Sequence, residues 1–167
     1  MKITKKPKKE NLKIRLGTEA DLDRVSEIVK KIWGMGGDSL LEQRFGIIGN
    51  KPWQEWTSAD ILKYIREKMG FFLAAELKGK VVGFATYRLD QDRKIGTVGY
   101  NGVDPDYGGK GIGTKLVEKT LNRMRKNGIV YARVITGLNE GHKPARKMYE
   151  KIGFKPLLET ISYAIKL

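Results

Sequence analysis

Four glycines within six residues give the clearest sign of a binding function in this chain. Gly108, Gly109, Gly111 and Gly113 belong to the segment Gly-Gly-Lys-Gly-Ile-Gly-Thr at 108–114. Glycine lets the backbone approach a ligand closely and turn its N–H groups toward it. A helix that follows such a turn adds the positive end of its dipole. The segment therefore predicts a turn that binds phosphate or pyrophosphate.

Two common phosphate-binding loops do not fit this turn. A Walker A loop requires Gly-Lys-Ser/Thr at its end, but Gly113 is followed by Thr114 and Lys115 in the reverse order. The dinucleotide fingerprint G-x-G-x-x-G also fails, because Leu116 stands where its third glycine belongs after Gly111 and Gly113. A different phosphate-containing ligand is expected.

The elements that must hold this turn follow from hydrophobic periodicity. Alternating or continuous apolar residues predict strands, and the Lys78-Gly79-Lys80 turn predicts a hairpin between two of them. The strands are expected at 12–16, 71–77, 81–89, 95–103, 129–135 and 158–167.

Helical spacing of apolar residues predicts the remaining regular structure. A helix after the Thr18 cap carries Leu22 to Ile32, a second ends at Asn127-Gly128, and a third begins near Pro144. Residues 34–70 are expected to form loops and short helices, one of them starting at Thr57. The order β-α-α-β-β-β-α-β-α-β predicts one α/β (α+β) domain over 11–167.

Composition excludes several classes of protein. The 167 residues contain no Cys and one His, which excludes a disulfide scaffold and a Cys nucleophile and argues against a zinc site. Neither a membrane span nor a secretory signal is found, so a cytoplasmic location is predicted. The net charge is +14, of which +4 falls on residues 1–10, a segment predicted to be a basic flexible tail.

Two motifs resemble the GNAT family of acyl-CoA-dependent N-acyltransferases. The family pattern Val-x-Pro-x-Tyr-Arg-Gly-x-Gly-Ile-Gly is matched by residues 103–113, with Gly108 in place of the usual Arg. The pattern Asn-x-x-Ala-x-x-Leu-Tyr-Glu-Lys-Leu-Gly-Phe is matched by residues 142–154, with His142 in place of Asn. The resemblance covers about 11–167 and implies a mixed, mainly antiparallel central sheet flanked by helices.

The resemblance also implies acetyl-CoA as co-substrate and no metal. The strand at 95–103 would splay from the strand at 129–135, and the pantetheine arm would lie between them. The residues implied in cofactor binding lie on that strand, on the glycine turn and at the start of the last helix: Asn101, Gly102, Val103, Gly108, Gly109, Lys110, Gly111, Ile112, Gly113, Thr114, Asn139, His142 and Arg146. Whether Asn139 or His142 contacts the CoA arm stays open.

The implied reaction is direct attack of an amine on the thioester. Tyr149 matches the family's general acid, which returns a proton to the CoA thiolate. The strand at 95–103 holds no carboxylate that could act as base, and Glu76, Glu42 and Glu55 are weaker candidates for that role. Other sequence candidates are Tyr100 and Trp33 for substrate binding.

Three functions compete at this stage. The first is an N-acetyltransferase acting on a protein N-terminus, a lysine or a small amine. The second is a non-catalytic acyl-CoA-binding module that acts as a sensor or docking protein. The third is contact with nucleic acid or the ribosome through the basic surface, which is not favoured because no strand interleaves aromatic and basic residues. A homodimer is an open alternative.

Overall fold

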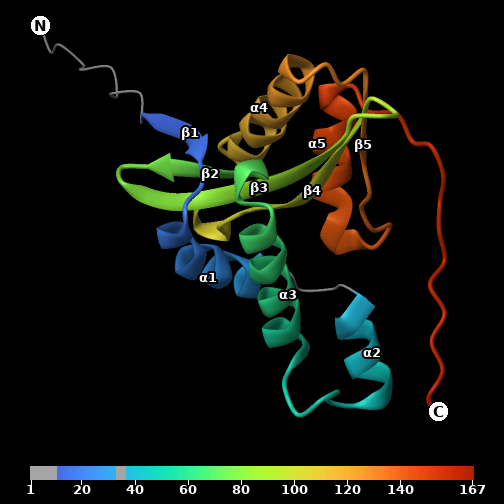
Figure 1. Cartoon of the computed structure of the whole chain (residues 1–167). Helices are drawn as coiled ribbons and strands as arrows, with labels where there is room; N and C mark the ends of the chain where they lie inside the picture. The colour runs from blue at the N-terminus through green and yellow to red at the C-terminus, as the bar shows by residue number, and fades with distance from the viewer. Residues whose placement is uncertain (1–10, 33–36) are drawn as a thin grey trace, which may run out of the picture.

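Five strands form one mixed sheet in a computed structural model that describes residues 11–32 and 37–167 (Figure 1). The strands lie in the order β1-β2-β3-β4-β5, as in the chain. Pairing is antiparallel from β1 to β4, and only β4 and β5 are parallel. The strands are β1 (Leu12–Leu16), β2 (Phe72–Leu77), β3 (Lys80–Asp90), β4 (Ile95–Val103) and β5 (Tyr131–Val134). The predicted fold class is confirmed.

Helices cover both faces of this sheet. Apolar residues of α1 and α3 join one buried cluster, while α4 and α5 pack on the opposite face in another. α2 packs against α3 and lies away from the sheet (Figure 1). The helices are α1 (Leu22–Ile32), α2 (Gly37–Phe45), α3 (Trp53–Glu67), α4 (Ile112–Lys126) and α5 (Lys143–Ile152).

Local sequence signals account for most of these boundaries. Thr18 and Asp21 form a reciprocal capping box ahead of α1. The β2–β3 turn places Lys78 and Gly79 at positive φ, as a tight hairpin requires. Gly153 ends α5 in the left-handed conformation, in which glycine is not strained.

The segment between β1 and β2 is more helical than predicted. It contains the 15-residue helix α3, which starts at Trp53 and not at Thr57, as well as α2. The helix expected from Thr57 is present in α3, where Ser58, Ile61 and Ile65 are buried at helical spacing, but the prediction missed α2 and the first turn of α3. Two helices therefore stand where loops and short helices were expected.

The predicted last strand at 158–167 is wrong. Residues 155–167 form no regular structure and run away from the body of the protein (Figure 1). Ile161 and Tyr163 are 78% and 88% exposed. Alternation indicates only that one face of a segment is apolar, whereas a strand also requires a partner for its backbone groups. The strand expected at 129–135 is also shorter, because β5 covers only Tyr131–Val134.

No helix in 11–32 or 37–167 has the length and apolar character to cross a membrane. The predicted basic tail at 1–10 lies outside the described residues.

The buried face between the sheet and α1 and α3 gives the first prediction. Phe72 of β2 is fully buried in this cluster, so Phe72→Ala should lower the free energy of unfolding by about 3–5 kcal/mol. Urea denaturation followed by circular dichroism measures this. Ile47→Ala, at a side chain that is 67% exposed, is the control and should change it by less than about 0.5 kcal/mol. Equal effects of the two substitutions would contradict the assigned core.

Candidate active site

A β-bulge in β4 lies at the centre of the candidate site. Ala85 of β3 pairs with Asn101, but Tyr87, two residues further on, pairs with Val98. β4 therefore holds one extra residue, which reverses the alternation of its side chains and takes backbone groups out of the ladder. The Thr86 hydroxyl donates a hydrogen bond to the Tyr100 carbonyl at 3.1 Å across this irregularity.

β5 covers only the first part of the length of β4. Their ladder joins Ile95–Val98 to Tyr131–Val134 and stops there. The edge of β4 at 99–103 is therefore not paired to β5. The family resemblance implied that the two strands separate at this end of β4.

Tyr149 of α5 meets this part of β4. Its side chain is buried, and its hydroxyl accepts a hydrogen bond from Asn101 Nδ2 at 2.9 Å. The same Asn101 amide donates to the Gly99 carbonyl at 3.0 Å. Burial raises the pKa of the Tyr149 hydroxyl above its usual value, and the Asn101 hydrogen bond offsets this only in part. The hydroxyl thus keeps its proton at neutral pH and is fixed beside the bulge.

The glycine-rich turn leads directly from β4 into α4. Gly109 and Gly111 have φ of 73° and 72°, a conformation that other residues rarely adopt, and Gly111 is the N-cap of α4. The first amides of α4 have no acceptors within the helix, so they can bind an anion. Lys110 holds its ammonium over the Tyr107 ring at 5.5 Å. Gly108 has a φ of −61°, which any residue can adopt.

The three candidates at the start of α5 form one cluster. His142 Nδ1 contacts the Asn139 side chain, which also accepts a hydrogen bond from the His142 amide. The Arg146 guanidinium donates to the carbonyls of Gly137 and Asn139 at 2.6 and 2.9 Å. These side chains order the loop that enters α5.

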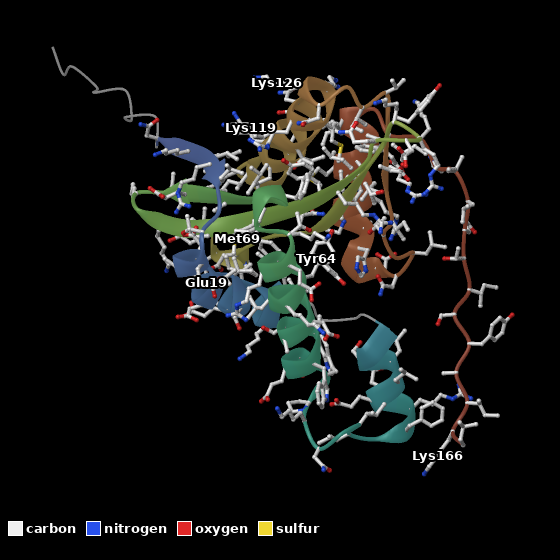
Figure 2. All side chains as sticks on the ribbon, in the orientation of Figure 1. Glu19, Tyr64, Met69, Lys119, Lys126 and Lys166 are labelled. Carbon is white, nitrogen blue, oxygen red and sulfur yellow. The ribbon has the colours of Figure 1, made fainter. Side chains whose placement is uncertain are left out.

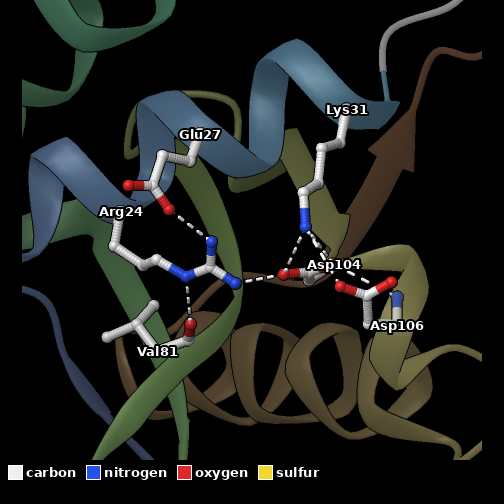
Figure 3. A network of polar contacts seen from close by, with 6 residues as sticks. All are labelled: Arg24, Glu27, Lys31, Val81, Asp104 and Asp106. Carbon is white, nitrogen blue, oxygen red and sulfur yellow. Dashed lines mark hydrogen bonds and ion pairs between the residues drawn. The ribbon is translucent and has the colours of Figure 1, made fainter.

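A buried carboxylate fixes the junction between β4 and the glycine-rich turn (Figure 3). The Asp104 side chain is fully buried and forms ion pairs with Arg24 and Lys31 of α1. It also accepts a hydrogen bond from the Asp106 amide, while its own amide donates to the Val82 carbonyl. This one residue joins α1, β3 and the turn.

The electrostatics of Asp104 agree with this role. Burial alone would raise the pKa of its carboxyl group, but the Asp106 amide, Arg24 and Lys31 outweigh that effect and lower the pKa. The carboxylate is therefore ionised at neutral pH.

The remaining sequence candidates divide into three groups. Tyr100 lies near the bulge, and its ring packs edge-on against the Tyr64 ring with 5.5 Å between the ring centroids. Tyr64 projects from α3 (Figure 2). Trp33 lies outside the described residues. Glu76 pairs with Arg15, and Glu42 accepts a hydrogen bond from the Trp53 amide, so other contacts already engage both carboxylates. Glu55, the third carboxylate candidate, lies in the first turn of α3.

Sequence reasoning missed two parts of the site. The Asp104-Pro105-Asp106 spacing is typical of a side chain that caps its own turn, but nothing local indicates Arg24, 80 residues earlier. The Asn101–Tyr149 pair also joins residues 48 positions apart. Only the fold brings these partners together.

Comparisons with known proteins agree with this geometry. The acetyltransferase (GNAT) family is matched over residues 35–154. An uncharacterized N-acetyltransferase of Methanocaldococcus jannaschii is 30% identical over 85% of this chain and 60% of its own length. A mycothiol acetyltransferase of Saccharomonospora viridis is 32% identical over 66% of this chain and 35% of its own length. The chain thus spans less than two thirds of either curated relative.

A solved structure supports the fold. The PaiA N-acetyltransferase from Thermoplasma acidophilum, solved in complex with coenzyme A, superposes with a TM-score of 0.67 at 21% identity. The superposition covers 87% of this chain and 90% of that one.

The Asp104 network gives the second prediction. Asp104→Asn leaves Arg24 and Lys31 without their buried partner, so it should lower the free energy of unfolding at pH 7 by about 3 kcal/mol. Because folding lowers the pKa of Asp104, its contribution is complete above the unfolded pKa of about 3.9. It is lost progressively as the pH falls toward the lower folded value, so the difference between wild type and variant should shrink steadily below about pH 4. Urea denaturation between pH 7 and pH 2 measures both effects.

Asp106→Asn is the matched control for this experiment. Asp106 also pairs with Lys31, but its side chain is 73% exposed, so its replacement should have a much smaller effect. Equal losses in the two variants would refute the assigned role of the buried carboxylate.

Proposed function

Because the chain belongs to the acetyltransferase (GNAT) family, we propose that it transfers an acetyl group from acetyl-CoA to a primary amine. The amine nitrogen attacks the thioester carbonyl carbon, so that a C–N bond forms and the C–S bond breaks. The amine loses a proton, and the thiolate sulfur gains one. The observation that carries the proposal is the buried Tyr149 hydroxyl, hydrogen-bonded to Asn101 beside the bulge of β4.

The described residues fit acetyl-CoA in two places. The amides from Gly108 to Thr114, with left-handed glycines at 109 and 111, are suited to the pyrophosphate, and Lys110 adds a positive charge. The open edge of β4 at Asn101, Gly102 and Val103 offers backbone groups to the pantetheine arm. Acetyl-CoA supplies the activated acetyl group.

A third set of contacts is proposed at the start of α5. Asn139, His142 and Arg146 order the loop between β5 and α5, the helix that carries Tyr149. We propose that these residues, together with the loop that they order, contact the CoA arm.

Tyr149 is proposed as the general acid. A tyrosine whose pKa is raised by burial keeps its proton at neutral pH and can give it to a thiolate. Asn101 orients the hydroxyl, and the bulge offers strand amides for the oxyanion of the tetrahedral transition state. Tyr100 is assigned to the acceptor, with Trp33 as the second sequence candidate.

A homodimer is proposed as the assembled form. Ile161, Tyr163 and Ile165 of the C-terminal segment are all at least 78% exposed, and their alternation would place them on one face if the segment paired as a strand. β5 is the last strand of the sheet, and its Tyr131 is 68% exposed. Within residues 11–32 and 37–167, the outer edge of β5 has no strand partner. The C-terminal segment of a second copy can pair with this edge through backbone hydrogen bonds.

The third prediction tests catalysis. Tyr149→Phe removes only the proton donor, so kcat should fall about 100-fold or more while the acetyl-CoA dissociation constant stays within about twofold. Thiol release from acetyl-CoA with a panel of amines measures turnover, and calorimetry measures binding.

Gly111→Glu is the companion variant. Glutamate at a φ of 72° is strained and places a negative charge at the pyrophosphate amides, so binding of acetyl-CoA should be lost. Full activity of Tyr149→Phe would refute its role as acid. Binding by wild type without turnover of any amine would favour the non-catalytic acyl-CoA sensor.

The fourth prediction tests the dimer by sedimentation. Wild type should sediment as a dimer, and the double change Tyr163→Lys with Ile165→Lys should weaken the dimer at least about tenfold, because it buries charge in the pairing face. Ser162→Lys, on the other face of the segment, should leave the dimer unchanged. A monomeric wild type would contradict the proposal.

A further inference from the structure

Three side chains form one polar row across the sheet beside the candidate active site. Arg88 of β3 pairs directly with Thr97 of β4, and Thr97 pairs with Arg133 of β5. Paired positions place their side chains on one face. The Arg133 Nε donates to the Thr97 hydroxyl at 3.1 Å, which fixes this guanidinium. All three line a cavity of about 420 Å³.

The two arginines of this row differ from the other arginine of the same cavity. Arg93 is neutralised by Asp90, at 2.6 Å. Neither Arg88 nor Arg133 forms an ion pair with any residue of the described chain. Asp92, the other acid of the lining, belongs to the β3–β4 turn and not to the row.

Guanidinium groups without a carboxylate are suited to bind one. Arginine presents N–H groups in a planar fork that matches the two oxygens of a carboxylate. Arg133 uses its Nε to bond the Thr97 hydroxyl, so its terminal N–H groups remain available for a ligand. The row therefore has the chemistry of a carboxylate site.

The row shares β4 with the proposed reaction centre, on the face opposite Tyr87 and Val98, which pack in the cluster of α4 and α5. Thr97 comes two residues before Gly99, where the bulge begins, and four before Asn101, which binds Tyr149. At about 3.3 Å per residue, Thr97 and Asn101 are roughly 13 Å apart at most. Burial raises the pKa of the Tyr64 hydroxyl, and the nearby positive charge of Arg88 partly offsets this. The Tyr64 ring contacts Tyr100, which is next to Asn101.

We propose that Arg88, Thr97 and Arg133 bind a carboxylate of the acceptor, so that the acceptor is an amine of amino-acid or short-peptide size. This inference rests on the proposed acetyltransferase function and names its substrate class. The cavity volume suits a ligand of this size.

The test compares acceptors that differ only in the carboxylate. Amino acids and dipeptides are assayed with acetyl-CoA beside their carboxamides, and the acids should show at least tenfold higher kcat/KM. Arg133→Gln and Arg88→Gln should each raise KM for the acids about 10- to 100-fold and leave the amides unchanged. Arg133→Lys keeps the charge but loses the fork, so it should restore only part of the preference.

A binding measurement separates this inference from the catalytic one. Calorimetry of a carboxylate acceptor titrated into protein saturated with CoA reports binding without turnover, and both glutamine variants should weaken it about 10-fold or more. Arg125→Gln is the control: it removes the same charge from α4, where Arg125 bonds Asn122, and should change nothing.

The outcomes are distinguishable. If amides and acids react equally and the row variants behave as wild type, the carboxylate site is refuted while the acetyltransferase stands. If acetyl-CoA binds but no amine of either kind reacts or binds, both proposals fail.

Discussion

The buried carboxylate of Asp104 is the constraint on which the candidate site depends. β4 must end there, the glycine-rich turn must begin there, and α1 must lie against both. Asp104 meets all three requirements through Arg24 and Lys31, the Asp106 amide and the Val82 carbonyl. A buried ion needs such partners because desolvation is costly without them. The position of the turn relative to the sheet is therefore fixed by the requirement to compensate one charge.

Once the end of β4 is fixed, the bulge and the short ladder with β5 determine the direction of each β4 side chain and which part of its backbone edge is left unpaired by β5. The extra residue between Val98 and Asn101 sends Tyr100 toward α3 and Asn101 toward α5. The ladder to β5 stops at Val98, so the same stretch of β4 has a free edge. One strand thus faces the Tyr149 hydroxyl on one side and the Tyr64–Tyr100 ring pair on the other, and its edge at 99–103 is not paired to β5.

How much of this arrangement the sequence predicts depends on how far apart in the sequence the interacting residues lie. The bounds of β1 and α1 follow from alternation and a capping box, and the left-handed glycines of the turn follow from residue type, because these signals are local. The Arg24–Asp104 pair joins residues 80 positions apart and carries no local signal. The segment 158–167 was wrongly predicted as a strand because alternation describes one face of a segment and not its partner. Motif resemblance identified Tyr149, but only the fold pairs it with Asn101.

The charges around the bulge also bear on the missing base. β4 carries no carboxylate, and Glu76 and Glu42 are held by other partners. An amine near unpaired guanidinium groups loses its proton more easily, because like charges lower the pKa of a cation. A carboxylate base beside the proposed row would draw the same arginines into an ion pair and occupy the groups that the proposed acceptor requires.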